Sequence, residues 1–203
     1  MTDRLGFFIG GMVHKTHRQR YPEMGGLAGI AKAKAAGASA IDIDVHGTKD
    51  GKVAAIHWPA DWRVNGKKIK GHVHAYTMAY INANWRSTAG RQYRVNPIEK
   101  IMEAAVKANL VLCLEAKSNV MLERPEVWAR VKANADRLGC KVVVMTIQQW
   151  GHTPEPRAAW ENAAERRLRA AHDAGLKTML LQRTHVSAAR WDFLDAIKGD
   201  RSA

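Results

Sequence analysis

Short and almost uninterrupted apolar runs alternate with amphipathic stretches along this chain, and this alternation limits its fold more than any other feature. Strands are predicted over 110–117, 141–148 and 176–182, and helices over 124–138 and 156–174. Strands this apolar are typical of a parallel sheet that is buried on both faces by helices. The fold class is therefore α/β.

The first half of the chain adds further elements of the same kind. We predict strands over 6–14, 40–45 and 52–57, helices over 26–36 and from Pro97 onward, and a last helix over 187–198. The turn Lys49-Asp50-Gly51 leaves no room for a helix between the second and third strands. Six strands can be recognised in total.

The chain is predicted to form a single domain over 1–203, because 203 residues supply one sizeable core. Residues 59–94 are too long for a simple connection, so they are expected to form a lid or a small insertion.

The longest apolar stretch, Leu5 to Val13, is too short to span a bilayer and has no cleavable leader before it. We therefore expect a cytoplasmic protein. Separately, Cys113 and Cys140 are expected to be core residues.

Basic residues outnumber acidic ones, 32 to 19, which gives a net charge of +13. This surplus favours polyanionic partners. Nucleic acid, an anionic cell-surface polymer and a phosphorylated small substrate are all compatible with it, and so is a basic surface without a specific ligand.

Two carboxylates stand two residues apart in the predicted strand 40–45, at Asp42 and Asp44. Side chains at this spacing point to the same side of a strand, with Cα atoms about 7 Å apart. An unpaired carboxylate on a buried strand is costly, and a bound cation would remove that cost. Oxygen ligands favour Mg²⁺, Ca²⁺ or Mn²⁺ over Zn²⁺.

A third carboxylate and a cation share one face near the end of the strand 110–117, at Glu115 and Lys117. A surface ion pair would show the same pattern, but a metal and an ammonium group together are what a phosphate-transfer site needs. His14 and His57 end two further strands, and imidazole is well suited to proton transfer near neutral pH. Because β/α barrels build active sites at the carboxyl ends of their strands, we predict that these groups form one site.

In order and spacing, these residues resemble the glycerophosphodiester phosphodiesterase family. The family's His-Arg-Gly and Pro-Glu-Asn motifs are similar to His14-Lys15-Thr16 and Pro22-Glu23-Met24. Its Glu-x-Asp strand, its Thr-x-Asp-Gly turn and its strand ending in His-Asp resemble residues 41–45, 48–51 and 56–58. Its Pro-Thr-Leu-Glu-Glu helix start and its Glu-x-Lys strand resemble residues 96–101 and 114–117, so the similarity runs from about Ile9 to Ser118.

The resemblance implies a TIM-type β/α barrel that hydrolyses a small glycerophosphodiester in lipid metabolism. It implies a divalent metal, Mg²⁺, Ca²⁺ or Mn²⁺, that is held by Asp42, Asp44 and Glu115. It also implies that His14 and His57 act as the acid and the base, and that Lys117 and Lys15 contact the phosphate.

Three positions depart from the family pattern. Lys15 replaces an arginine and exchanges a bidentate fork for a point charge. Asp42 replaces a glutamate and reaches one methylene less, and Trp58 replaces an aspartate. The family's last strands are not visible either, so the barrel is expected to be shortened or to be completed by a neighbouring subunit in a homo-oligomer.

Two rival functions stay open. One is a related phospholipase. The other is a catalytically weakened barrel that binds an anionic polymer, such as nucleic acid or a teichoic-acid-like polymer. Aromatic and basic residues alternate in 59–94, as in some polymer-binding surfaces, but we favour a lid there. His17, His46, His72 and His74 are expected to be solvated, with His46 pointing away from Asp42 and Asp44.

Overall fold

A six-stranded sheet forms the centre of the computed structural model, which describes residues 27–35, 39–56, 62–69, 71–87, 94–117, 119–149, 157–183 and 189–192. The strand order is β2-β1-β6-β7-β8-β9. Strands β1, β6, β7 and β8 are parallel, while β2 and β9 pair antiparallel at the two edges. The bounds are β1 Ala40–Gly47, β2 Val53–Ala55, β6 Val111–Ala116, β7 Val142–Gln149, β8 Lys177–Arg183 and β9 Ala189–Asp192.

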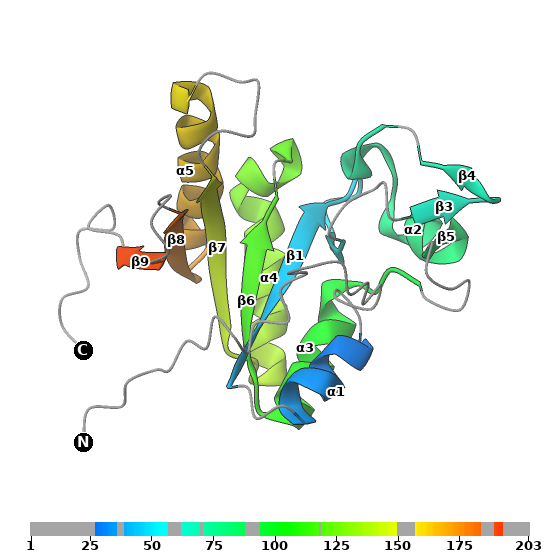
Figure 1. Ribbon diagram of the computed structural model, residues 1–203, viewed down its shortest axis with the longest axis horizontal. Coiled ribbons are helices and arrows are strands. Elements are labelled where there is room, and N and C mark those ends of the chain that lie inside the picture. The colour runs from blue at the N-terminus through cyan, green and yellow to red at the C-terminus, as the bar shows by residue number, and fades with distance from the viewer. Residues whose placement is uncertain are drawn as a thin grey trace.

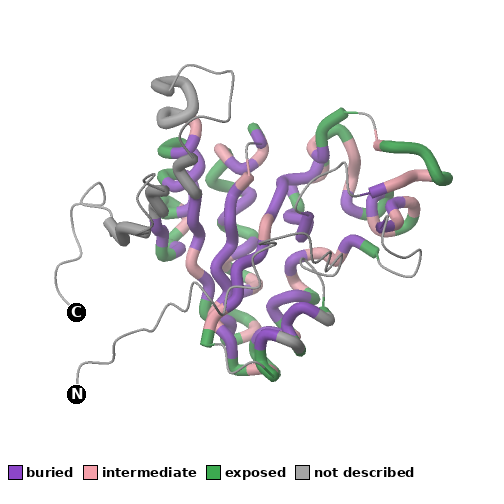
Figure 2. The backbone as a smooth tube through the Cα atoms, viewed as in Figure 1, coloured by how far each residue is buried: buried purple, intermediate pink, exposed green. Residues whose placement is uncertain are grey.

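Four helices form one layer with a shared core against this sheet (Figure 1). They are α1 Leu27–Ala35, α3 Ile98–Ala108, α4 Pro125–Leu138 and α5 Arg157–Asp173. Ile41 and Ile43 of β1 and Leu112 and Leu114 of β6 point into this core and are almost completely buried. In Figure 2, β1 and β6 are coloured as buried along most of their length. The alternate residues, which include the acids of β1 and β6, lie on the opposite face.

The predicted helix ends follow from local sequence. Helix α3 begins directly after Pro97 and ends at Asn109, whose φ of 54° is left-handed. Helix α4 has Pro125 in its first turn and ends at Gly139, with φ 67°. Proline suits a first turn because its missing N–H has no helical partner there, and a left-handed residue ends the helix. None of the helices in the described residues is long and apolar enough to span a membrane.

One expectation needs correction. The prediction of a last helix over 187–198 is wrong, because Ala189–Asp192 form strand β9, which pairs with β8. The exposed edge of β8 offers unpaired backbone groups, and pairing with them outweighs a weak helical pattern. The predicted α/β class with a parallel sheet is confirmed; β2 and β9 lie at the edges of the sheet that the described strands form, and closure into a barrel stays a prediction. The strand predicted over 6–14 lies outside the described residues.

The described residues of the predicted insertion, 62–69 and 71–87, form a small folded unit. It contains β3 Trp62–Val64, β4 Lys67–Lys68, η2 Val73–Ala75, α2 Met78–Asn84 and β5 Trp85–Ser87. The three strands form an antiparallel sheet in the order β4-β3-β5. Asn65 and Gly66, with φ 49° and 77°, make the tight turn between β3 and β4. Trp62, Trp85 and neighbouring apolar residues give this unit a core of its own.

The small unit is attached to the turn between β1 and β2 through Asp50. Asp50 Oδ1 accepts hydrogen bonds from Thr48 Oγ1 at 2.6 Å and from the Met78 N–H at 3.0 Å. The Lys49 N–H donates to the Tyr76 carbonyl at 2.9 Å. Burial opposes ionisation of Asp50, but these hydrogen bonds outweigh it and lower the pKa of its carboxyl group.

Asp50→Ala is expected to lower the free energy of unfolding by roughly 1–3 kcal/mol, because the Met78 N–H and the Thr48 hydroxyl lose their acceptor. Urea denaturation measures the change. As a control, Asp136→Ala removes an exposed i,i+4 partner of Lys132 and is expected to change stability by less than about 0.5 kcal/mol. Equal losses in the two variants would contradict the role given to Asp50.

Candidate functional site

The parallel register of β1 and β6 brings the predicted acidic residues together. Asp44 lies directly beside Glu115, and Asp42 lies beside Cys113. These four residues occupy the face of the sheet that points away from the helix layer, since their neighbours Ile43 and Leu114 point into the core. The convergence of three carboxylates on one face is therefore a property of this fold.

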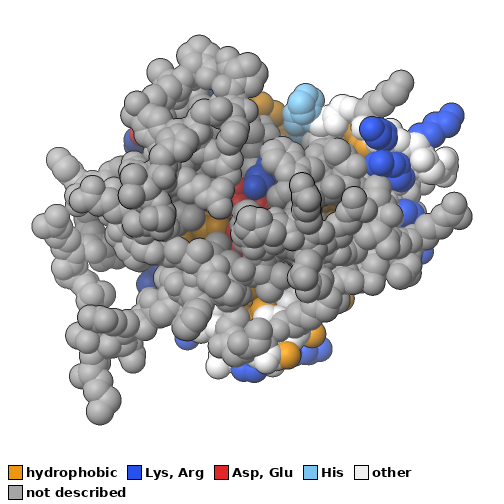
Figure 3. All heavy atoms as spheres, in the orientation of Figure 1, with side chains coloured by type: hydrophobic (Ala, Val, Ile, Leu, Met, Phe, Trp, Pro, Cys, Tyr) orange, Lys and Arg blue, Asp and Glu red, His pale blue; other side chains and the backbone are white. Residues whose placement is uncertain are grey.

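Lys117 joins the acidic residues at the carboxyl end of β6. Its N–H donates to the Val45 carbonyl of β1 at 3.1 Å. Its Nζ lies 2.6 Å from Asp44 Oδ1 and also contacts Glu115 Oε1. Asp42 and Glu115 are 6% and 5% exposed, so one ammonium group faces three carboxylates in a largely buried place. Figure 3 shows acidic side chains beside a basic one near the middle of the viewed face.

Electrostatics at this site disfavour the charged forms of two acids. Burial, and then the charges of Asp44 and Glu115, raise the pKa of Asp42 well above its usual range. Burial also raises the pKa of Glu115 to about 7, against a partial opposing effect of Lys117. Burial works against the charge on Lys117, but the carboxylates of Asp44 and Glu115 outweigh it and raise the pKa of that ammonium. When all three acids are ionised, the site has more negative charge than Lys117 can balance, and the raised pKa values reflect this.

The chemistry of these groups fits a divalent cation. Asp42 Oδ1 and Glu115 Oε2 are buried and have no hydrogen-bond partner among the described residues. Buried oxygens of this kind are costly unless they are paired or bind a metal. With side chains as they stand, no three His, Cys, Asp or Glu residues in the described ranges form a ready ligand group. Lys117 instead bridges Asp44 and Glu115 directly.

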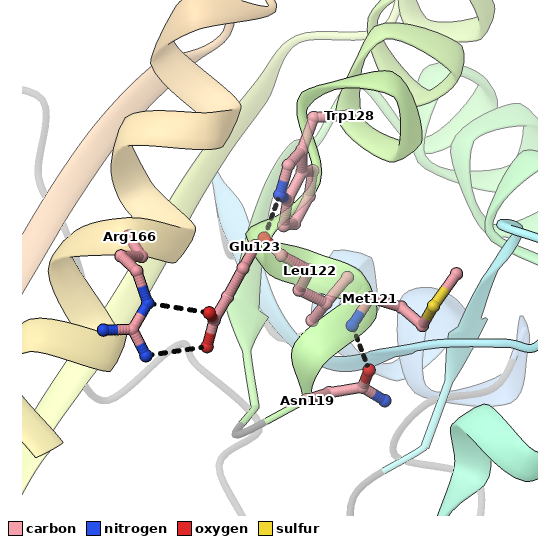
Figure 4. Close-up of polar contacts among 6 residues, drawn as sticks. All are labelled: Asn119, Met121, Leu122, Glu123, Trp128 and Arg166. Carbon is pink, nitrogen blue, oxygen red and sulfur yellow. Dashed lines mark hydrogen bonds and ion pairs between the residues drawn. The ribbon is translucent and has the colours of Figure 1, made fainter. Parts of the chain in front are cut away.

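A short 3-10 turn, η3 Val120–Glu123, closes the carboxyl ends of β1 and β6 (Figure 4). Asn119 fixes its start, since Nδ2 donates to the Gly47 carbonyl and Oδ1 accepts from the Met121 N–H, both at 2.9 Å. Trp128 Nε1 donates to the Leu122 carbonyl at 2.7 Å, which joins the turn to α4. Glu123 pairs with Arg166 of α5 at 2.7 Å. Asn119 and Trp128 therefore hold the edge of the site in place, and the partly exposed Glu123–Arg166 pair adds a surface contact with α5.

Several predicted site residues cannot be placed. His14, Lys15 and His57 lie outside the described residues, so their roles stay predictions. The expectation that the strand before His57 ends at the same edge as β1 and β6 is wrong, because β2 is antiparallel to β1. A parallel pair of strands needs a long crossover connection, which is usually a helix, and the turn between β1 and β2 is too short for one. The N–H of Ile56, the last described residue of that run, donates to the Asp44 carbonyl at 2.9 Å.

His46 is the described residue that sequence reasoning set aside too early. It was expected to be solvated and to point away from the acids. Instead β1 continues to Gly47, and two-residue alternation places His46 on the face of Asp42 and Asp44. Its exposed fraction is only 7%. The even spacing of positions 42, 44 and 46 was the signal that could have found it.

The raised pKa values predict how the stability of metal-free protein depends on pH. Folded protein holds the Glu115 proton more tightly than the unfolded chain does, so the free energy of unfolding is expected to fall as pH rises from 4.5 to about 7. Asp42 acts in the same direction. Asp42→Asn in EDTA is expected to raise stability at pH 8 by roughly 2 kcal/mol. Urea denaturation of both proteins at pH 5 and pH 8 tests this, and a wild-type midpoint that does not fall with pH would refute it.

Several solved structures with a similar fold bear the name of phosphodiesterases. One, assigned as a glycerophosphoryl diester phosphodiesterase from Silicibacter pomeroyi, has TM-score 0.50 and 20% identity over 78% of this chain and 77% of that one. An Oleispira antarctica phosphodiesterase, solved with its product sn-glycerol-3-phosphate, has TM-score 0.55 and 15% identity over 78% of this chain and 59% of that one. This chain has the fold of the glycerophosphodiester phosphodiesterases.

A third structure of this fold, a glycerophosphodiester phosphodiesterase from Parabacteroides distasonis, has TM-score 0.50 and 18% identity over 78% of this chain. The chain spans 59% of that protein and of the Oleispira one. No protein-family model matches the sequence, and no curated protein is significantly similar to it. The family resemblance is thus confirmed at the level of fold, and the reaction must be argued from the residues.

Proposed function

We propose that this protein is a metal-dependent phosphodiesterase that hydrolyses a small, glycerophosphodiester-like substrate. The observation that carries the proposal is the buried meeting of Asp42, Asp44, Glu115 and Lys117 on one face of the sheet. Their excess negative charge suits a divalent cation, and the adjacent ammonium group suits an anionic substrate. The glycerophosphodiester phosphodiesterase fold supports this choice among metal-dependent reactions.

In this proposal Asp42, Asp44 and Glu115 hold the cation. A divalent metal bound there supplies positive charge that neutralises a non-bridging phosphate oxygen. The Lys117 ammonium, which lies beside Asp44 and Glu115, would donate to a phosphate oxygen of the substrate. Because the site is largely buried, these charges act in a low dielectric, where they stabilise the transition state more than they would in water.

Proton transfer is assigned to His14 and His57. A hydroxyl adjacent to the phosphodiester attacks phosphorus, and an imidazole nitrogen of one histidine accepts its proton. The second imidazole donates a proton to the leaving alkoxide oxygen as the P–O bond breaks, and water then opens the cyclic phosphate with the two roles reversed. Lys15 adds a point charge to the phosphate, with less control of its orientation than an arginine fork provides.

The test is hydrolysis of glycerophosphodiesters, which carry the hydroxyl that the proposed mechanism needs, with Mg²⁺, Ca²⁺ or Mn²⁺. We expect metal-stimulated activity that EDTA abolishes and that His14→Ala and His57→Ala each lower by at least about 100-fold. Activity that is indifferent to EDTA and to both substitutions would reject the proposal. Product analysis separates it from a related phospholipase, which would release a lipid product from a phospholipid.

A further inference from the structure

Lys117 lies one residue beyond the end of β6, where the pairing of β6 with β1 stops. Its side chain nevertheless has a fixed direction, because its Nζ contacts both Asp44 and Glu115. The Lys117 N–H donates to the Val45 carbonyl at 3.1 Å and so continues the ladder by one step. A hydrogen bond at the end of a ladder opens easily unless a further contact follows it.

Asn119 supplies that further contact. It is only 5% exposed, and its Nδ2 donates to the Gly47 carbonyl at 2.9 Å. Gly47 follows Val45 by two residues along β1, just as Asn119 follows Lys117 by two residues. In a continued parallel strand, the backbone N–H of residue 119 would donate to the Gly47 carbonyl. The side-chain amide of Asn119 takes that place, so bonds to β1 lie on both sides of the Lys117 side chain.

The oxygen of the same amide has a separate task. Asn119 Oδ1 accepts a hydrogen bond from the Met121 N–H at 2.9 Å and thereby caps η3 (Figure 4). The donor half of the amide therefore ties the chain after Lys117 to β1, while the acceptor half starts the 3-10 turn. Substitutions can separate these two halves.

Capping alone does not require an asparagine. Serine and aspartate accept a hydrogen bond at a helix start about as well as asparagine does. The amide differs from them in having one group that donates and another that accepts. The bond from Asn119 Nδ2 to Gly47 is thus the feature that a capping role leaves unexplained.

Gly47 indicates that this approach to β1 is a close one. A Cβ at position 47 would overlap the Cβ of Met121, so the strand has a glycine where the η3 segment meets it. Glycine weakens a strand, because it has more backbone freedom to lose and no side chain to pack. The chain accepts that cost at the residue whose carbonyl Asn119 binds.

We propose that Asn119 is a positioning residue, which holds Lys117 where its ammonium group can reach the substrate phosphate. The link to the phosphate rests on the proposed function, but the hold on Lys117 can be measured without turnover. Without the bond to Gly47, the chain after Lys117 separates from β1 more often, and the ammonium spends less time between Asp44 and Glu115. Residues that orient a functional side chain in this way typically affect activity by roughly 10- to 100-fold.

Asn119→Ser and Asn119→Ala test the two halves of the amide. Serine can still accept from the Met121 N–H, but its hydroxyl is one atom shorter than the amide and does not also reach the Gly47 carbonyl. Both variants are expected to lower kcat/KM for glycerophosphodiesters at saturating metal by roughly 10- to 100-fold. Asn119→Ser keeps the cap of η3 and is therefore expected to remain folded in urea denaturation when Asn119→Ala is less stable.

Asn134→Ala is the matched control. Asn134 on α4 also donates one side-chain hydrogen bond, to Glu99 at 3.1 Å, and accepts one, from Arg137 at 3.2 Å. It belongs to the helix layer, on the other side of the sheet from the acidic residues. Its substitution is expected to leave kcat/KM within about twofold of wild type.

The Lys117 ammonium group provides a readout that needs neither metal nor substrate. Held between Asp44 and Glu115, it is expected to give a slowly exchanging Nζ–H signal in ¹⁵N NMR spectra, which Lys117→Met assigns by its absence. Both Asn119 variants are expected to exchange these hydrogens at least about fivefold faster, and Asn134→Ala is not.

Equal changes in Asn119→Ala and Asn134→Ala, or wild-type activity and exchange in Asn119→Ser, would overturn the positioning role. Faster exchange in the Asn119 variants of a protein that hydrolyses no phosphodiester would refute the proposed function alone. Metal-stimulated hydrolysis combined with unchanged exchange in both Asn119 variants would refute the positioning role alone.

Discussion

Glu115→Gln is expected to lower metal-stimulated phosphodiester hydrolysis by roughly 100- to 1,000-fold at saturating substrate. The substitution keeps the size of the side chain but removes one of the carboxylates assigned to the cation. Both the affinity for metal and the stabilisation of charge in the transition state then decline. Measuring kcat and KM over a series of Mg²⁺ or Mn²⁺ concentrations separates the two effects.

Glu123→Gln provides the matched control for this experiment. The same chemical change there affects a partly exposed pair with Arg166 on the far side of η3, so activity is expected to stay within about twofold. Glu115→Gln should also remain folded in EDTA, because it removes a buried carboxylate whose ionisation is unfavourable. If Glu115→Gln retained more than about a tenth of the wild-type activity at saturating metal, its role as a ligand would be wrong.

Gly47→Ala is expected to lower the free energy of unfolding by roughly 2–4 kcal/mol, which corresponds to a fall of about 10 °C in Tm. A Cβ added at Gly47 would overlap the Cβ of Met121 and would lie 3.4 Å from Leu122 Cδ2. Neither Met121 nor the η3 backbone can move away easily, because Asn119 ties this turn to the Gly47 carbonyl. Thermal and urea denaturation measure the effect.

Gly139→Ala serves as the comparison. That glycine ends α4 with φ 67° and has no atom within 4 Å of an added Cβ, so alanine suffers only backbone strain of about 1–2 kcal/mol. A Gly47→Ala variant as stable as Gly139→Ala would show that η3 is not packed against β1 as described. Where Gly47→Ala remains folded, a parallel loss of activity would indicate that η3 positions Lys117.

The candidate site was predictable to the extent that it depends on spacing within one strand. Asp42 and Asp44 share a face because strand side chains alternate, and the same rule pairs Glu115 with Lys117. Their meeting required the pairing of β1 with β6, two segments separated by about 70 residues of sequence. A shift of one residue in that register would have turned one pair toward the helices. His46 was missed although the same alternation, applied through position 46, places it on the face of Asp42 and Asp44.

What the sequence by itself determined is the class of fold, the order of the parallel strands and of the helices that cover them, and the local chemistry of each motif. Apolar periodicity, Pro97 and Gly139 act over a few residues, so their effects can be recognised without the rest of the chain. The tertiary structure alone decided that Asp44 lies beside Glu115, that Ala189–Asp192 extend the sheet, and that Arg63 stands between Lys68 and Arg86. Each of these depends on backbone hydrogen bonds between strands, and those bonds are chosen by competition among all the edges that the folding chain presents.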